Sequence, residues 1–161
     1  MLSIHAHETA SGGQEFDAPA ATLKPADFLR SLFHDAIDSG ADVVVTHGPH
    51  VLRGIEIYKG KPIFYGLGSL FFELGRDWPR EWFDSVVAVS EFRGGKVSEV
   101  RLYPIVLGGP AESRSRLDQG SPRLAMGMDA RRILEGLQRQ SQAFGTQIRI
   151  ENGVGLIREV R

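Results

Sequence analysis

The stretch ADVVVTHGPHVLRG, residues 41–54, opens with three consecutive valines a few residues before two histidines that are separated by a glycine and a proline. A short run of β-branched apolar residues is typical of a buried strand, and Gly and Pro are typical of the turn that ends one. Two interpretations account for the histidines. One is a turn that carries them incidentally, and the other is a metal site at the end of a sheet.

The residues before this stretch predict a strand and a helix. Residues 1–5 are mainly apolar, and residues 25–39 carry apolar side chains at the spacing of one buried helical stripe. Pro25 suits the first turn of this helix, and Gly40 suits the left-handed position after its end. With a strand at 42–46, the order is strand, helix, strand, which is typical of an α/β domain whose sheet is covered by helices. The stripe consists of Leu29, Leu32, Phe33, Ala36 and Ile37.

Four of the five histidines follow the two predicted strands. His5 and His7 come after the first strand, and His47 and His50 come after the second. Because binding groups gather where the strands of such sheets end, we expect these imidazoles to lie close together. Neutral imidazole binds Zn, Mn, Fe or Ni, and a site without cysteine suits catalysis better than a structural zinc site. The fifth histidine, His34, is predicted to lie on the solvated face of the helix.

The rest of the chain predicts three hairpins. In each, two segments of alternating polar and apolar residues flank a short turn that contains glycine. The predicted turns are Lys59-Gly60, Arg93-Gly94-Gly95 and Asn152-Gly153.

A second helix and a loop complete the prediction. The helix is expected from Asp129, acting as its N-cap, to about Ala143. Residues 108–127 are rich in Gly, Pro, Ser and Arg, and we predict a mobile loop there. The predicted fold class is α/β, with layered α+β character, in a single domain over residues 1–161.

Composition excludes several classes of protein. The net charge of −1 gives no field that attracts nucleic acid, and without cysteine there are no disulfides or iron–sulfur clusters. No apolar run is long enough for a membrane segment, and His5, His7 and Glu8 interrupt any signal peptide. As written, the sequence is expected to be cytoplasmic, or envelope-associated if a leader or an anchor precedes it.

Two further groups of residues each allow two interpretations. Trp78 and Trp82 form either an aromatic wall beside a substrate or the edge of a core. Five arginines either grip a polyanion or lie on a solvated surface interspersed with acidic residues. These arginines are Arg114, Arg116, Arg123, Arg131 and Arg132.

Residues 40–74, GADVVVTHGPHVLRGIEIYKGKPIFYGLGSLFFEL, resemble the signature region of the CapA family of poly-γ-glutamate capsule-synthesis proteins. The family motifs are a G-H-x-P-H-V segment, an I-E-x-Y-x-G-K-P-I hairpin and a Y-S-L-G-N-F segment. Residues 3–8, SIHAHE, resemble an upstream H-x-x-E segment, and residues 131–155 resemble the C-terminal region of bacterial relatives. The resemblance therefore extends over most of the chain. The family belongs to the calcineurin-like metallophosphoesterase superfamily.

The resemblance implies a sandwich of mixed sheets flanked by helices, with a two-metal phosphoesterase centre that uses Mn, Fe or Zn. It implies that His5, His47 and His50 are metal ligands, with His7 as a further candidate, and that His47 and His50 are catalytic. The implied substrate is a phosphoester or an envelope polymer. Two residues are implied to contact substrate or to orient a ligand, and these are Glu8 and Ser69.

The sequence also departs from the family pattern. The Gly-Asp segment, the second acidic residue and the Asn-His pair of the superfamily are absent, and Asn152, the only asparagine, is explained by its turn. Thr46 replaces the usual glycine, and Ser69 replaces the usual asparagine. We therefore expect the C-terminal portion of such a protein, which binds metal weakly and is impaired or inactive unless self-association or an N-terminal half completes the site. The alternative function is a non-catalytic module in the assembly or binding of envelope polymer.

Overall fold

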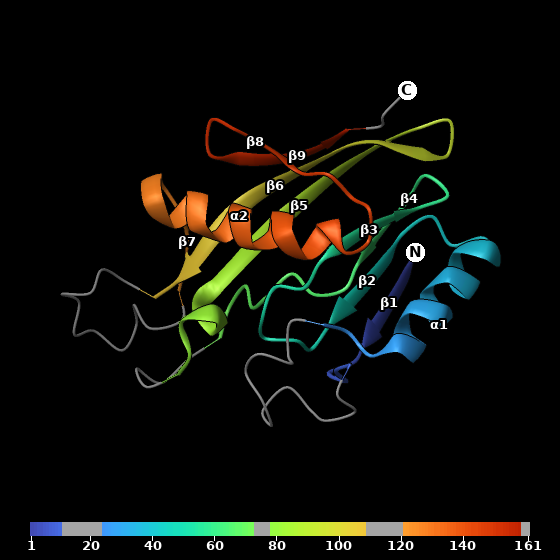
Figure 1. Cartoon of the computed structure of the whole chain (residues 1–161), viewed down its shortest axis with the longest axis horizontal. Coiled ribbons are helices and arrows are strands. Elements are labelled where there is room, and N and C mark those ends of the chain that lie inside the picture. The colour runs from blue at the N-terminus through green and yellow to red at the C-terminus, as the bar shows by residue number, and fades with distance from the viewer. Residues whose placement is uncertain (11–23, 73–77, 109–120, 159–161) are drawn as a thin grey trace.

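The computed structural model describes residues 1–10, 24–72, 78–108 and 121–158. These residues form two sheets and two helices (Figure 1). One sheet has the strand order β1-β2-β4-β3, and the other has the order β5-β6-β9-β8, with β7 paired to β6. The predicted fold class is confirmed.

The four-stranded sheet contains the predicted strand–helix–strand unit. Strand β1 (Leu2–His5) pairs in parallel with β2 (Val44–His47), and β2 pairs in parallel with β4 (Lys61–Phe64). Strand β3 (Ile55–Tyr58) forms the predicted hairpin with β4. The register of β1 and β2 sets His5 directly opposite His47. The two strands therefore end level with each other, at the edge where the histidines lie.

Helix α1 (Asp27–Asp38) packs on this sheet, as Figure 1 shows. Its buried stripe is Leu29, Phe33 and Ile37, spaced four residues apart. Leu32, which the periodicity placed in the stripe, is 42% exposed, because the contact with the sheet is narrower than the predicted stripe. Gly40 has a φ of 105° two residues after the end of the helix, as expected for the left-handed position.

The second sheet is antiparallel and contains the other two predicted hairpins. Strand β5 (Asp84–Arg93) pairs with β6 (Lys96–Leu107), and β6 pairs with β9 (Val154–Arg158). Strand β8 (Arg149–Glu151) pairs with β9 across the Asn152-Gly153 turn. Both residues of that turn have positive φ angles, 49° and 77°, which a tight two-residue hairpin requires.

The predicted mobile loop is wrong in its last part. Strand β7 (Pro122–Leu124) pairs antiparallel with residues 105–107 of β6. Its three residues are too few for a visible alternation, so the Gly- and Pro-rich composition around them dominated the prediction. Residues 109–120 of the predicted loop lie outside the described residues.

Helix α2 (Gly127–Gln142) lies across the second sheet and buries Ile133, Leu134 and Leu137, as predicted. The predicted cap is wrong, because Met126 is the N-cap and makes no side-chain hydrogen bond. Asp129 lies inside the first turn, where it binds two arginines described below. Neither described helix is both long and apolar enough to cross a membrane.

The C-terminal end of α2 also joins the two sheets. The hydroxyl of Ser141 accepts a hydrogen bond from the backbone N–H of Ile55 in β3, at 3.0 Å. The hydroxyl of Thr146 accepts one from Ile57, at 3.1 Å. Ile55 belongs to a hydrophobic cluster that also contains Leu102 of β6. One core therefore connects both sheets and holds the histidine edge of the first sheet in place.

Candidate functional site

Three imidazoles meet at the carboxyl ends of β1 and β2. His5 and His47 are opposite each other in the ladder, and their Nδ1 atoms are 3.2 Å apart. The Nε2 atoms of His5 and His7 are 2.9 Å apart. His5 and His47 are exposed, and His7 is partly buried. The structure therefore brings together the histidines that the strand order had predicted to be neighbours.

Gly48 makes this close approach feasible. It has a φ of 107°, which residues with a side chain rarely adopt. A Cβ atom at this position would lie 3.0 Å from Nε2 of both His5 and His7. The Gly-Pro turn after β2 therefore leaves room for the two imidazoles of the first strand.

His50 lies beside this group and is held on two sides. Its ring stacks on Trp82, with centroids 4.7 Å apart and planes 13° apart, and its Nδ1 lies 3.1 Å from the hydroxyl of Ser69. The ring centroids of His7 and His50 are 5.8 Å apart. Ser69, a predicted neighbour of substrate or ligand, thus fixes the orientation of one candidate catalytic imidazole.

Trp82 comes from a short 3-10 turn, η1 (Arg80–Phe83), and is 4% exposed. It packs with Val51 and Leu107, as a residue at the edge of a core does. The ring of Trp78 lies 4.5 Å from that of Trp82 and is partly exposed. The two tryptophans differ, since Trp82 supports His50 from the core and Trp78 reaches the surface.

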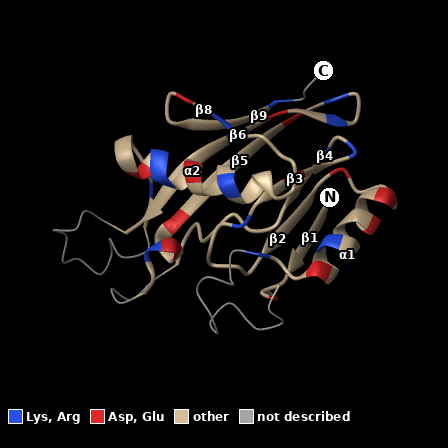
Figure 2. Ribbon diagram, viewed as in Figure 1, with Lys and Arg blue, Asp and Glu red and all other residues tan. Residues whose placement is uncertain are grey.

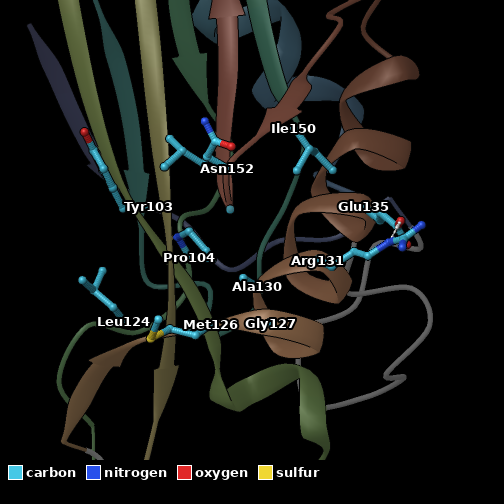
Figure 3. A pocket seen from close by; sticks show the side chains of 13 residues that line it. Tyr103, Pro104, Leu124, Met126, Gly127, Ala130, Arg131, Glu135, Ile150 and Asn152 are labelled. Atoms are coloured by element: carbon cyan, nitrogen blue, oxygen red, sulfur yellow. Dashed lines mark hydrogen bonds and ion pairs between the residues drawn. The ribbon is translucent and has the colours of Figure 1, made fainter.

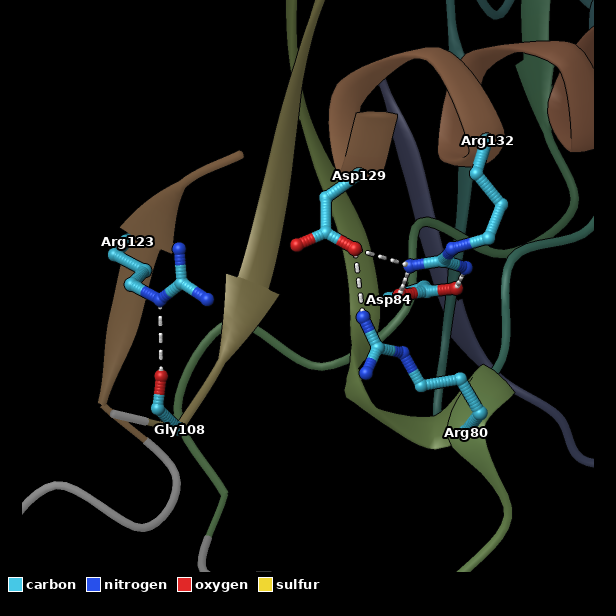
Figure 4. A network of polar contacts seen from close by, with 6 residues as sticks. All are labelled: Arg80, Asp84, Gly108, Arg123, Asp129 and Arg132. Carbon is cyan, nitrogen blue, oxygen red and sulfur yellow. Dashed lines mark hydrogen bonds and ion pairs between the residues drawn. The ribbon is translucent and has the colours of Figure 1, made fainter. Parts of the chain in front are cut away.

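A polar network attaches this turn to the start of α2 (Figure 4). The guanidinium of Arg132 binds both carboxylate oxygens of the buried Asp84, which follows η1 directly. Arg80 donates to Asp129 at 2.7 Å. Hydrogen bonding to Asp84 raises the pKa of Arg132. The turn that carries Trp82 is therefore fixed to a helix of the second sheet.

The arginines that were considered for a polyanion site have partners within the protein. Besides Arg132, Arg131 pairs with Glu135 at 2.7 Å, and Arg123 donates to the carbonyl of Gly108 at 3.2 Å. Arg114 and Arg116 lie outside the described residues. Basic and acidic residues alternate along the described ribbon (Figure 2), which agrees with the solvated-surface interpretation.

The loop that carries His7 and Glu8 is anchored by a fully buried arginine. Arg53 donates to the carbonyl oxygen of His7 at 3.0 Å and to that of Glu8 at 3.1 Å. Ala26, before α1, donates its backbone N–H to the same Glu8 carbonyl at 3.3 Å. Arg53 was not predicted from the sequence, although an arginine within an otherwise apolar VLRG run was a usable signal.

The carboxylate of Glu8 has an unsatisfied oxygen. Its Oε2 is buried and has no hydrogen-bond partner among the described residues. A buried carboxylate oxygen without a partner is costly, so such an atom usually faces a cation, a water molecule or a ligand. Glu8 therefore adds a free oxygen donor to the loop that holds His7.

A second polar network, centred on Glu56, lies beneath α1. Tyr65 donates to Oε2 of Glu56 at 2.7 Å, and Arg30 donates to Oε1 at 3.0 Å. Burial acts to raise the pKa of Glu56, but the hydrogen bonds from Arg30, Tyr65 and His34 outweigh it, and the net pKa is lowered. Burial and the bond to Glu56 raise the pKa of Tyr65. None of these residues was singled out as functional from the sequence, and their role is to join α1 to the sheet.

The prediction of a solvated His34 is wrong. Its Nε2 lies 3.1 Å from Oε1 of Glu56, and its ring stacks on Tyr58 with centroids 3.8 Å apart. Both partners come from β3, more than twenty positions away along the chain, so helical periodicity could not reveal them. His34 does not belong to the histidine group at the strand ends.

The donor set at the strand ends fits a metal, but the side chains bind one another. Among the residues that the structure describes, no three His, Asp or Glu side chains are arranged to hold an ion. The two ring nitrogens of His5 lie at hydrogen-bond distance from His47 and His7, so these atoms face each other. Imidazole nitrogens and carboxylate oxygens, such as those of these histidines and of Glu8, are the ligand types that Zn, Mn and Fe take.

A cavity of about 680 Å³ lies elsewhere, between α2 and the β8–β9 hairpin (Figure 3). Apart from the Arg131–Glu135 pair, the side chains that line it are mainly apolar. They include Tyr103, Leu124, Met126, Ala130, Ile150 and Val154. It lacks the grouping of acid–base residues that the strand ends have.

Comparison with known proteins identifies the family. Residues 18–74 match the family described as "Bacterial capsule synthesis protein PGA_cap". The chain is 46% identical over 68 residues to "PGA biosynthesis protein CapA" of Bacillus subtilis, covering 42% of this chain and 16% of that protein. It is 33% identical over 109 residues to "Capsule biosynthesis protein CapA" of Bacillus anthracis, covering 66% of this chain and 25% of that protein. These matches confirm the resemblance to the CapA family.

A longer match is to a protein of Sinorhizobium fredii named "Uncharacterized protein y4sH". The two are 40% identical over 199 residues, which cover 98% of this chain and 41% of that protein. The chain thus spans less than half the length of the relatives that it matches. The link to the calcineurin-like superfamily stays a prediction.

Proposed function

We propose that this chain takes part in the synthesis of a capsule or envelope polymer of the poly-γ-glutamate type, and that its histidine group belongs to a metal-dependent phosphoesterase site. The observation that carries the proposal is the register of β1 and β2, which sets His5 opposite His47, with His7 in contact. The names of the CapA relatives support a role in capsule synthesis, and the imidazole side chains support the binding of a metal ion.

In this proposal, His5, His47 and His50 hold the metal, with His7 as a further ligand and Glu8 as an oxygen donor. A divalent cation bound there would polarise a phosphoryl oxygen and supply a hydroxide nucleophile at neutral pH. Arg53 orients this donor group by fixing the backbone carbonyls of His7 and Glu8.

His47 and His50 are also the candidate catalytic residues, acting either as metal ligands or as donors to the transition state. Ser69 engages Nδ1 of His50 and Trp82 stacks on its ring, so this imidazole is held in one orientation. Such positioning of a proton donor or acceptor is worth about 10²- to 10⁴-fold in rate.

One observation favours the alternative of a non-catalytic module. His5 lies at hydrogen-bond distance from both His47 and His7, and no three described acidic or histidine side chains form a metal-binding group. In that case the fold serves to bind or assemble envelope polymer, and the imidazoles stabilise the strand ends.

Hydrolysis of bis-p-nitrophenyl phosphate by the Mn²⁺-loaded protein distinguishes the two functions. We expect metal-dependent turnover that His50→Ala lowers at least about 100-fold. His34→Ala is the matched control, because it removes the histidine outside the group. Absence of metal-dependent turnover, or equal loss in both variants, would favour the non-catalytic module.

A further inference from the structure

Strand β1 is the outer strand of the four-stranded sheet, as far as the described residues extend. Leu2 and Ala6 donate their backbone N–H groups to carbonyl oxygens on the β2 side, at 2.9 and 3.0 Å. Because the backbone groups of a strand point alternately to its two sides, those of Ser3 and His5 point away from β2. No described strand pairs with β1 on that side. This edge therefore offers hydrogen-bonding groups to a further strand.

The side of α1 that faces this edge is apolar and exposed. Arg30 and His34 contact Glu56 in β3, so their side of the helix faces the opposite edge of the sheet. At 100° per residue, Leu32 and Phe28 lie on the other side of the helix, toward β1. They are 42% and 57% exposed. An exposed apolar surface beside an unpaired strand edge is typical of an interaction site.

The side chains of this surface suit a contact between two identical chains. A twofold axis brings each residue near the axis close to its own copy, so a fixed charge there would repel its copy. Strand β1 consists of Leu, Ser, Ile and His, and it lacks the lysine or proline that commonly shields a sheet edge. Leu32 and Phe28 are uncharged as well. A second copy of this chain is therefore the occupant that the surface favours.

The hydrogen-bonding pattern of β1 is also complementary to itself. In an antiparallel pair, residues whose backbone groups point outward lie opposite each other. Ser3 of one copy then pairs with His5 of the second copy, and Ile4 lies opposite its own copy. Ile4 packs with the core beneath α1, so the two Ile4 side chains meet on the helix side of the sheet. One axis therefore satisfies both the strand edge and the apolar side of the helix.

We propose that two copies of this chain pair through their β1 strands, antiparallel about a twofold axis at Ile4. The pair forms one continuous sheet, with the Leu32 sides of the two α1 helices facing each other across the axis. Ser3 and His5 both lie on the exposed face of β1, so Ser3 of the second copy comes beside His5. Each histidine group thereby gains a neighbouring hydroxyl from the other copy. The inference rests on backbone direction and exposure, and it is independent of metal binding.

Size-exclusion chromatography with light scattering, in EDTA and over a range of concentrations, measures this association. We expect the wild type to reach twice the chain mass of 17.7 kDa. Leu32→Lys should weaken dimerisation about tenfold or more, because it sets like charges across the axis. Val89→Lys is the matched control, because Val89 is also 42% exposed but lies on β5, at the end of the other sheet. Circular dichroism of each variant verifies that it folds.

A single introduced cysteine tests the register, since the chain has no cysteine of its own. The two Ile4 positions of the proposed pair lie within reach of a disulfide. With oxidised glutathione as the oxidant, Ile4→Cys should form a covalent dimer faster than Val89→Cys does. A monomeric wild type, equal weakening by the two lysine variants, or cross-linking at Ile4 no faster than at Val89 would each overturn the inference.

Discussion

Glu56 is a buried carboxylate that is held by two side chains of α1, Arg30 and His34, and by Tyr65, which follows β4 directly. Because it is 4% exposed, removing its charge leaves its partners with unmet hydrogen bonds in a region of low dielectric. We predict that Glu56→Gln lowers the free energy of unfolding by about 2–3 kcal/mol. Urea denaturation measures this change in the free energy of unfolding. Glu135→Gln, which removes an exposed pair with Arg131, is the control and should cost less than about 0.5 kcal/mol.

The same carboxylate predicts a dependence of stability on pH. Its folded-state pKa lies below its ordinary value of 4.5, so the unfolded chain binds the proton at higher pH than the folded protein. The stabilisation by Glu56 is therefore fully present above about pH 4.5, and it is lost as the pH falls through the folded-state pKa. Denaturation curves should show a shallower loss of stability on acidification in Glu56→Gln than in the wild type. Equal slopes would contradict this assignment.

At the scale of the element, the role of Gly48 in the turn after β2 can be tested by comparison with Gly40, which follows α1 and has a similar φ angle. Gly48 and Gly40 have φ angles of 107° and 105°, but only Gly48 would place a Cβ atom against imidazoles. Alanine at either position costs roughly 1–2 kcal/mol in backbone strain. We predict that Gly48→Ala costs more and also displaces His5 and His7.

Thermal unfolding and histidine NMR signals of the two variants check this prediction. Gly40→Ala should leave the imidazole signals of the histidine group unchanged, since nothing lies within 4 Å of its Cβ position. If both variants shift those signals equally, the close approach of Gly48 to the imidazoles is not what orders the turn.

In helix α2, by contrast, replacing a glycine is expected to raise the free energy of unfolding. Gly136→Ala should stabilise the protein by about 0.5–1 kcal/mol, because alanine has the higher helix propensity and its Cβ atom fits without a clash. Chemical denaturation measures the gain. A loss of stability would show that the space beside Gly136 is not free.

The elements that were predicted correctly are those whose sequence pattern lies within the element itself. The left-handed φ angles at Lys59-Gly60 and Asn152-Gly153 follow from turn chemistry, and the buried stripes follow from helical periodicity. Asp129 was wrong as a cap because its partners, Arg80 and Arg132, are set by the fold rather than by the helix start.

At the scale of the whole molecule, the candidate site was predictable only in part. Strand order alone placed His5, His7, His47 and His50 together, because parallel strands end at one edge. The support of His50 by Trp82 was not predictable, since it depends on a turn attached to the second sheet. The buried role of Arg53 and the contact of His34 with Glu56 likewise depend on packing between distant segments.

The proposed function depends on the binding of a metal ion by the histidine group at the strand ends. The most direct measurement is the Mn²⁺ content of the protein after incubation with the ion and dialysis, in the wild type, His47→Ala and His34→Ala. We expect about one ion or more per chain in the wild type and in His34→Ala, and none in His47→Ala. No retained metal in the wild type, or equal metal in all three proteins, would contradict it.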